Sequence, residues 1–110
     1  MSDSKIVIYH YANREIRSFL IHTEISGYRV EHFRGPVDRG SEDALKRLGV
    51  IGAQVVKGIM SIQGVMEIWI KPKEIRIRKE KTSSWDEIEK RIVKVLNEAL
   101  RRKEIRALKV

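Results

Sequence analysis

Hydrophobic and polar residues alternate in several short segments of this chain, and in two longer segments hydrophobic residues recur every three or four positions. Alternation sends successive side chains to opposite faces of a strand, whereas the longer spacing forms one stripe along a helix. The order in which the two patterns follow one another therefore predicts the order of strands and helices.

The N-terminal third predicts strands. "KIVIYHY" at 5–11 and "IRSFLIH" at 16–22 alternate, and the polar "ANRE" at 12–15 between them predicts the turn of a hairpin. "YRVEHF" at 28–33 alternates again and is interpreted as an optional third strand. "RGPVDRGSED" at 34–43 holds two glycines and a proline, which favour a loop.

A helix is expected from Ser41, because serine followed by two acidic residues is typical of a helix start. Its apolar stripe is Leu45, Leu48, Gly52, Val55, Ile59 and Ile62. Gly49, Gly52 and Gly58 lower helix propensity, so they predict either a split helix or a close approach of the helix to a sheet. The segment from Gln54 to Ser61 carries the clearest helical pattern.

The second half of the chain again predicts strands followed by a helix. Gly64 is suited to the left-handed residue that ends a helix. Two alternating runs then flank the turn "KPKE" at 71–74 and predict a hairpin with one apolar face. The isoleucines that share this face are Ile68, Ile70, Ile75 and Ile77, and the side chains that point the other way are Glu67, Trp69, Lys71, Arg76 and Arg78.

A last helix begins after Ser84, which forms the spacing of a capping box with Glu87. Its apolar stripe is Ile88, Ile92, Val95, Leu96 and Ala99. The predicted fold is therefore α+β: a two-layer sandwich in which two helices cover one face of an antiparallel sheet, in the order ββ(β)αββα. Residues 1–110 form a single domain, with a basic helix end or tail at about 100–110.

The composition of the chain restricts the classes of function that it can have. No hydrophobic run is long enough for a membrane span and the N-terminus lacks a signal-peptide layout, so we expect a cytoplasmic protein with no membrane partner. Four Asn and Gln residues against 23 Lys and Arg favour a thermophilic source. The net charge is +8, and residues 71–110 carry +7 of it. This asymmetry indicates either an anionic partner or a solvated, ion-rich surface.

Candidate chemistry is sparse. The chain has no cysteine, which excludes thiolate catalysis, disulfides and a cysteine-ligated metal site built by this chain alone. His10, His22 and His32 fall on three separate predicted strands without the spacing of a metal motif, so no metal site is expected. No nucleophile–base arrangement or phosphate loop appears, and we predict that the protein is not an enzyme.

The outward row of the second hairpin is the candidate binding face. Trp69, Lys71, Arg76 and Arg78 share one parity, which places an aromatic ring beside cations on the side of the sheet away from the helices. Such a face suits stacking with phosphate contacts, and it equally suits an acidic protein. The alternative for Trp69 is that its ring packs under a loop or against a symmetry-related copy of the chain.

The motif around this hairpin resembles the N-terminal domain of the Nfu/NifU-type iron–sulfur cluster scaffolds. The shared elements are "IMSIQGV" with Gly64 and Val65, "EIWIKP" ending at Pro72, "IRIRK" ending at Lys79, and Trp85 six positions later. The fit runs without gaps from about Gln54 to Leu96. Upstream, Asn13 and Phe19 keep the family's separation, but "ANRE" stands where that family has an Asn-Pro-Asn turn.

The resemblance implies an accessory module. In that family the cluster-binding thiolates belong to a separate downstream domain with a Cys-x-x-Cys pair, which this chain lacks. We therefore expect no cofactor bound by this chain alone. The first hypothesis is a non-catalytic protein-interaction module that serves iron–sulfur cluster assembly through a partner protein. The alternative is a small basic nucleic-acid-binding protein that uses the open face of its sheet.

Overall fold

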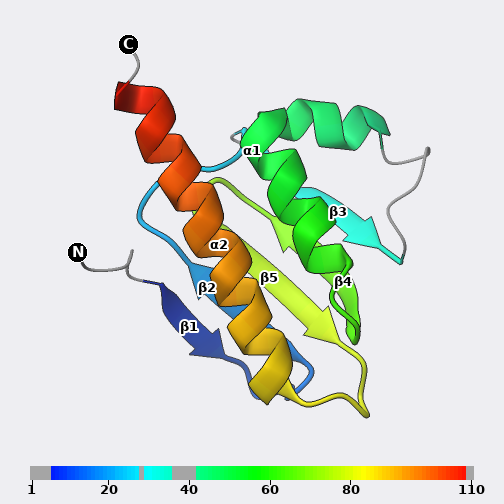
Figure 1. The fold of residues 1–110 in the computed structure, drawn as a ribbon. Coiled ribbons are helices and arrows are strands. Elements are labelled where there is room, and N and C mark those ends of the chain that lie inside the picture. Colours follow the sequence, from blue (N-terminus) through cyan, green and yellow to red (C-terminus); the bar gives the residue numbers. More distant parts are fainter. Residues whose placement is uncertain (1–5, 28, 36–41, 109–110) are drawn as a thin grey trace.

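The computed structural model describes residues 6–27, 29–35 and 42–108 of the chain. Seven elements follow one another as βββαββα (Figure 1). They are β1 (Val7–His10), β2 (Ile16–Leu20), β3 (Glu31–Arg34), α1 (Glu42–Met60), β4 (Val65–Ile70), β5 (Glu74–Lys79) and α2 (Trp85–Leu108). The predicted fold class is confirmed, and the optional third strand is formed.

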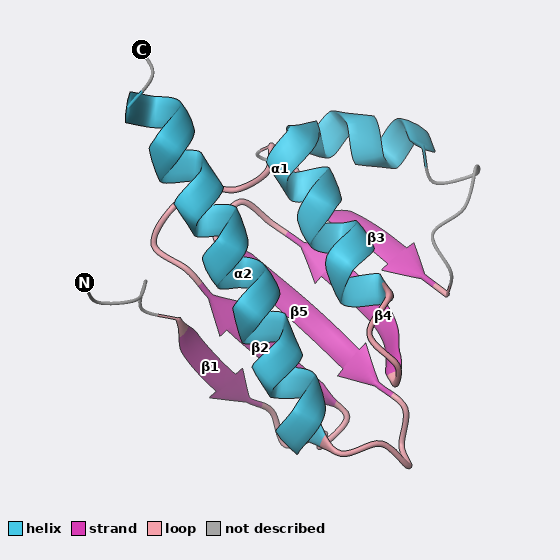
Figure 2. Cartoon of the chain, in the orientation of Figure 1, coloured by secondary structure: helices cyan, strands magenta, loops and turns pink. Residues whose placement is uncertain are grey.

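The five strands make one antiparallel sheet in the order β1-β2-β5-β4-β3. The predicted second hairpin, β4 with β5, occupies the middle, and β5 also pairs with β2. Both helices lie on the same face of this sheet, side by side (Figure 2). One face is thus covered and the other is open, as the single apolar face of the predicted second hairpin requires.

The hydrophobic core lies between the helices and the sheet. Each central strand sends alternate residues into it, and the helices add their apolar stripes. Its fully buried side chains include Phe19, Val55, Val56, Ile59, Ile68, Ile70, Ile75, Ile77, Ile92 and Leu96. Nearly all of these were assigned to inward faces by periodicity alone, which shows how strongly the pattern determines this layer.

The glycines of α1 confirm the predicted split of the helix, whereas their close approaches are to a connecting segment and to α2 and not to the sheet. Gly49 has φ +85° and ψ 173°, which interrupts the helix with a kink. Gly52 lies so close to the segment beneath it that an added Cβ would be 3.1 Å from the carbonyl oxygen of Ile25. Gly58 packs against Val95, where α1 meets α2. The helix is therefore split at one glycine and approaches its neighbours closely at two others.

Several predicted boundaries differ from the structure. β2 ends at Leu20, two residues before the predicted end, and β3 begins at Glu31 rather than at position 28. β2 ends at the pair Leu20–Glu74, because its partner strand β5 begins at Glu74. The segment that follows still contacts the β4–β5 turn, where Ile21 N donates to Lys73 O and Ile25 N to Pro72 O, each at 3.0 Å. The predicted helix start at Ser41, most of the loop at 34–43 and residue 28 lie outside the described residues.

Two predicted turns have the expected geometry. Gly64 has φ +99°, the left-handed conformation that a glycine adopts at little cost. α2 begins directly after Ser84, whose Oγ accepts a hydrogen bond from Asp86 N at 3.2 Å. The reciprocal capping box was predicted wrongly, because Ser84 Oγ binds Asp86 N rather than Glu87 N, and the Glu87 carboxylate accepts a hydrogen bond from Arg91 Nε at 3.3 Å.

Candidate binding face

The open face of the sheet collects every second residue of the five strands. The side chains on this face are Val7 and Tyr9 from β1, Ile16, Ser18 and Leu20 from β2, Glu74, Arg76 and Arg78 from β5, Glu67 and Trp69 from β4, His32 and Arg34 from β3, and Tyr11 and Lys71 just beyond the ends of β1 and β4. Both helices of the described residues lie on the other side of the sheet (Figure 1). The open face is therefore a broad surface of mixed aromatic and charged character.

The four predicted binding residues come together here. Trp69 lies directly across from Arg76, and Arg78 lies across from Glu67. Lys71 follows Trp69 by two positions and therefore points to the same side. Parity and the β4–β5 pairing account for this placement, but a role in binding stays a prediction.

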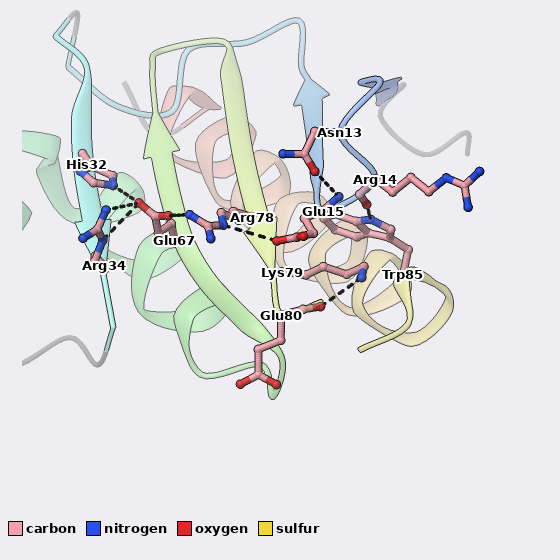
Figure 3. A network of polar contacts seen from close by, with 10 residues as sticks. All are labelled: Asn13, Arg14, Glu15, His32, Arg34, Glu67, Arg78, Lys79, Glu80 and Trp85. Atoms are coloured by element: carbon pink, nitrogen blue, oxygen red, sulfur yellow. Dashed lines mark hydrogen bonds and ion pairs between the residues drawn. The ribbon is translucent and has the colours of Figure 1, made fainter. Parts of the chain in front are cut away.

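Glu67 is the centre of a charged cluster on this face, although its side chain is only 4% exposed. His32 Nε2 donates to its Oε2 at 2.8 Å, Arg34 reaches the same oxygen at 3.3 Å, and Arg78 donates to Oε1 at 2.8 Å (Figure 3). Arg78 also lies 3.7 Å from Glu15. Each oxygen of the buried carboxylate thus has a donor, which such a group requires.

These partners determine the pKa of Glu67. Burial by itself raises the pKa of this carboxyl group, since it disfavours the charged form. The hydrogen bond from His32 and the charges and hydrogen bonds of Arg34 and Arg78 lower it by more, so the pKa lies below the usual value of 4.5. Glu67 is therefore ionised at neutral pH and neutralises part of the cationic charge around it.

A second cluster surrounds Glu74. Ser18 Oγ donates to Glu74 Oε2 at 2.9 Å and accepts from the Tyr11 hydroxyl at 2.8 Å. Arg76 lies 3.5 Å from the same carboxylate, and its guanidinium stands 5.2 Å from the centre of the Tyr11 ring. Lys71 approaches the other oxygen of Glu74 at 3.8 Å. The cations of this half of the face are therefore paired as well.

Trp69 does not pack under a loop in the described residues. Its ring stacks on His32 of the neighbouring strand, with centroids 4.8 Å apart and planes 11° from parallel. Near the opposite edge of the same face, the rings of Tyr9 and Tyr11 meet edge to face with centroids 4.7 Å apart. The face therefore presents aromatic rings at both ends with ion pairs between them.

Sequence reasoning missed several members of this surface. Glu74 was assigned to a turn, and Glu67 was noted only for its direction. His32 lies on the strand whose existence was left open, and Arg34, assigned to the loop after it, is the last residue of that strand. Their alternation with Phe33 was the available signal, but only the pairing of β3 with β4 shows that they meet Glu67.

The residues that carry the family motif are structural. Lys79 is buried on the covered side, where its Nζ donates to Glu80 O at 3.0 Å and its backbone N donates to Glu15 O at 2.9 Å. Trp85 Nε1 donates to Arg14 O at 2.6 Å (Figure 3). Both therefore anchor the turn between β1 and β2, in which Asn13 Oδ1 accepts a hydrogen bond from Glu15 N.

The other motif residues serve the second hairpin. Gly64 O accepts a hydrogen bond from Glu80 N at 2.7 Å, and Val65 N donates to Ile62 O at 3.2 Å. Pro72 lies in the turn that Lys71 N closes on the Glu74 carbonyl at 2.8 Å. The spacing of the motif thus follows from the way a helix end, a hairpin and the start of α2 pack against one another.

The histidines do not converge. His10 ends β1 and His32 lies in β3, and these two strands form opposite edges of the sheet, while His22 follows the end of β2. Among residues 6–27, 29–35 and 42–108, no group of three His, Asp or Glu side chains is arranged to hold a metal ion. Over the same ranges, no helix has both the length and the apolar composition needed to cross a bilayer.

Comparison with known proteins finds similarity of fold only. No protein-family model matches the chain, and no curated protein sequence matches it either. Among solved structures, a NifU-like protein from Saccharomyces cerevisiae superposes with a TM-score of 0.65 at 16% identity, covering 91% of this chain and 81% of that one. Protein SAV1430 from Staphylococcus aureus gives 0.62 at 17% identity, covering 84% and 98%.

A third relative, SeR13 from Staphylococcus epidermidis, gives a TM-score of 0.56 at 16% identity and covers 90% of this chain and 99% of its own. At such identities the likeness concerns the arrangement of the backbone and not shared chemistry. The chain therefore has the fold of a NifU-like protein and of small staphylococcal α+β domains.

Proposed function

We propose that this chain is a non-catalytic interaction module that docks a protein partner through the open face of its sheet. The supporting observation is the face itself: five strands wide, uncovered by either helix, and provided with partly exposed aromatic rings. Aromatic and arginine side chains are the residues most enriched in protein interfaces. The fold likeness to a NifU-like protein supports iron–sulfur cluster assembly as the process in which the partner takes part.

The charge arrangement favours a protein over a nucleic acid. Nucleic-acid surfaces rely on cations that are free to neutralise phosphates. Here Arg34 and Arg78 contact Glu67, while Lys71 and Arg76 contact Glu74. An incoming phosphate backbone would have to compete with these carboxylates, whereas a protein can offer polar groups of both signs.

In this proposal, any iron–sulfur cluster is bound by the partner protein and not by this chain. The chain has no cysteine, and thiolates are the usual protein ligands of such clusters. Anaerobic reconstitution of the purified chain, followed by absorbance and iron analysis, is expected to yield no stoichiometric cluster.

Site-directed photo-cross-linking in cells tests the proposal. A photoreactive amino acid replaces Trp69 on the open face, and a matched variant carries it at Lys94, an exposed position of α2 on the opposite side of the molecule. The proposal predicts a discrete adduct from position 69 that protease degrades and nuclease leaves intact, with mass spectrometry identifying a cluster-assembly protein. A nuclease-sensitive adduct would instead support the nucleic-acid alternative.

A further inference from the structure

Charges balance in the half of the open face that surrounds Glu67. Its cations are Arg34 and Arg78, and Arg78 contacts the carboxylates of both Glu67 and Glu15, at 2.8 Å and 3.7 Å (Figure 3). With His32 neutral, two cations therefore face two carboxylates. Glu67 is also held by short hydrogen bonds, each at 2.8 Å, with His32 Nε2 and with Arg78. Among the described residues, this half has no excess positive charge to offer an incoming anion.

The half of the open face that surrounds Glu74 has one cation in excess. Lys71 Nζ lies 3.8 Å from one oxygen of the Glu74 carboxylate and Arg76 Nη2 lies 3.5 Å from the other, so two cations share one negative charge. Both distances are long for charge-assisted contacts. The short hydrogen bond to Glu74, at 2.9 Å, comes from the neutral Ser18. The side chains of the two cations are 44% and 39% exposed and that of Glu74 is 22% exposed, so an anion from solution meets the cations first.

Arg76 can turn toward an incoming anion at little cost. Its guanidinium stands 5.2 Å from the centre of the Tyr11 ring, and its contact with Glu74 is at the outer limit of a hydrogen bond. Within the described part of the chain, its buried Nε has no hydrogen-bond partner. Reorienting the guanidinium therefore breaks no short hydrogen bond.

Two aromatic rings border Arg76, and each already has one face occupied. Trp69 lies directly across from Arg76 on β4 and stacks on His32. Tyr11 has the Arg76 guanidinium over its ring. Proteins that bind single-stranded nucleic acid stack bases on open ring faces and follow the backbone with several cations. One excess cation beside half-occupied rings is instead suited to a single carboxylate of a protein.

Apolar surface adjoins these cations. Leu20 of β2 lies directly across from Glu74, and Tyr9 of β1 lies across from Ser18 in the next row of the sheet. Both apolar side chains are exposed. A segment that places an acidic residue on the two cations therefore has apolar surface beside it to cover, and burying that surface adds to the affinity.

We propose that Lys71 and Arg76 together bind a carboxylate of the partner protein, and that Leu20 and Tyr9 contact an apolar residue beside it. Glu74 holds the two cations in the free chain, and the partner's carboxylate takes over part of that contact on docking. A guanidinium and a carboxylate can form two parallel hydrogen bonds, which are among the stronger contacts of proteins. The inference rests on the proposed function, because it names the half of the open face that docks and the chemistry of the residues that it receives.

The probe is a short synthetic peptide with two adjacent glutamates between leucines, titrated into the isotope-labelled chain at physiological ionic strength. The proposal predicts NMR shift changes at the side-chain N–H groups of Arg76 and Trp69 and at the backbone amides of the β4–β5 turn. The same peptide with glutamines in place of the glutamates is the charge control, and an oligothymidylate is the nucleic-acid control. Each control is expected to bind at least about tenfold more weakly.

Glu74→Gln is the most specific test on the protein side. It removes the negative charge that the two cations share and keeps an oxygen that can accept from Ser18. Binding of the glutamate peptide is therefore expected to tighten by about threefold, the scale of one surface charge pair. Glu15→Gln is the matched control, since it makes the same charge change beside Arg78 in the balanced half. It should alter the affinity by less than about 1.5-fold.

Arg76→Gln is expected to weaken binding of the glutamate peptide by about tenfold, because it removes the charged donor pair. Arg34→Gln is the matched comparison: it also removes one cation of the open face, but from the balanced half, and should weaken binding by no more than about twofold. Neither side chain is buried, so the folded state should survive each change, which the amide spectra of the variants check.

Four results would overturn the carboxylate site: no binding of the glutamate peptide, equal binding of the glutamine peptide, shift changes centred on Arg34 and Arg78, or equal effects of Glu74→Gln and Glu15→Gln. Each would leave the proposed docking function standing as long as position 69 still cross-links to a protein. Tighter binding of the oligothymidylate than of the glutamate peptide would overturn the site in favour of a nucleic acid. A missing or nuclease-sensitive cross-link from position 69 would contradict the docking function itself.

Discussion

The two tryptophans of the chain lie on opposite sides of the sheet and contrast in almost every respect. Trp85 is 7% exposed, belongs to the core, donates its ring N–H to Arg14 O and has the Arg17 guanidinium 5.0 Å from its ring centre. Trp69 keeps part of its surface exposed and stacks on His32. The comparison separates a face that stabilises the fold from a face that is available to a partner.

The same contrast holds for the charged residues. On the covered side, Lys79 is buried and ties a strand to the following turn. On the open face, Glu67 is buried by the cations that surround it and not by a helix. Both arrangements satisfy polar groups, but only the second leaves its members where another molecule can reach them. The following substitutions test this division through the free energy of unfolding.

Trp85→Ala should cause the largest loss. Removing a buried aromatic side chain is expected to lower the free energy of unfolding by about 3–5 kcal/mol. Trp85→Phe is the matched variant: it keeps most of the ring but leaves Arg14 O without its donor, for a loss of about 1 kcal/mol. Urea denaturation measures both. Equal, near-zero losses would mean that Trp85 is not part of the core.

Gly64→Ala should come next. Its φ of +99° is unfavourable for any residue with a Cβ, and the added atom would lie 2.7 Å from Ser83 Oγ and 2.9 Å from Ile88 Cδ1. We expect a loss of about 1–3 kcal/mol by thermal or urea denaturation. Gly35→Ala, also at positive φ but with nothing within 4 Å, isolates the backbone contribution and should cost less. An equal loss at both positions would contradict the close packing around Gly64.

Glu67→Gln should lower stability at neutral pH by about 1–3 kcal/mol, because charge-assisted hydrogen bonds to three cationic or polar side chains are weakened. The pKa of Glu67 is lower in the folded state than its usual 4.5. Its stabilising effect is therefore present above pH 4.5 and disappears as the pH falls through the lower folded value. Denaturation from pH 7 to pH 2 should show wild type and variant converging in acid. A constant difference in the free energy of unfolding between wild type and variant across this pH range would contradict the pairing of Glu67 with its cationic neighbours.

Trp69→Ala should have the smallest effect on stability, below about 1 kcal/mol, because the ring is partly exposed and stacks on one histidine. The matched comparison is Trp85→Ala under the same conditions. A loss as large as that of Trp85→Ala would place Trp69 in the structural core and remove the distinction between the two faces.

How much of the fold and of the open face could be predicted from the sequence depends on how far apart in the chain the interacting residues lie. The inward isoleucines of β4 and β5, the left-handed Gly64 and the start of α2 after Ser84 follow from local periodicity and turn chemistry, and they are found as predicted. The fold class follows from the order of those elements. The predicted end of β2 was wrong because that end depends on where its partner strand β5, distant in sequence, begins.

The open face was predictable only in part. Parity alone placed Trp69, Arg76 and Arg78 on one side. The ion pairs to Glu67 and Glu74 depend on strand register and on the neighbouring strands β2 and β3, which alternation does not specify. Consequently the sequence indicated a cationic patch, and the structure shows a surface in which cations and carboxylates are paired.

The most direct test of the account is the affinity of Trp69→Ala for the protein that cross-links at position 69. Isothermal titration of the purified pair should show at least about a 30-fold weaker Kd, the scale of an aromatic hot spot of about 2 kcal/mol. The free energy of unfolding should stay close to that of wild type, and Lys94→Ala should bind normally. An unchanged Kd for Trp69→Ala would contradict docking through the open face.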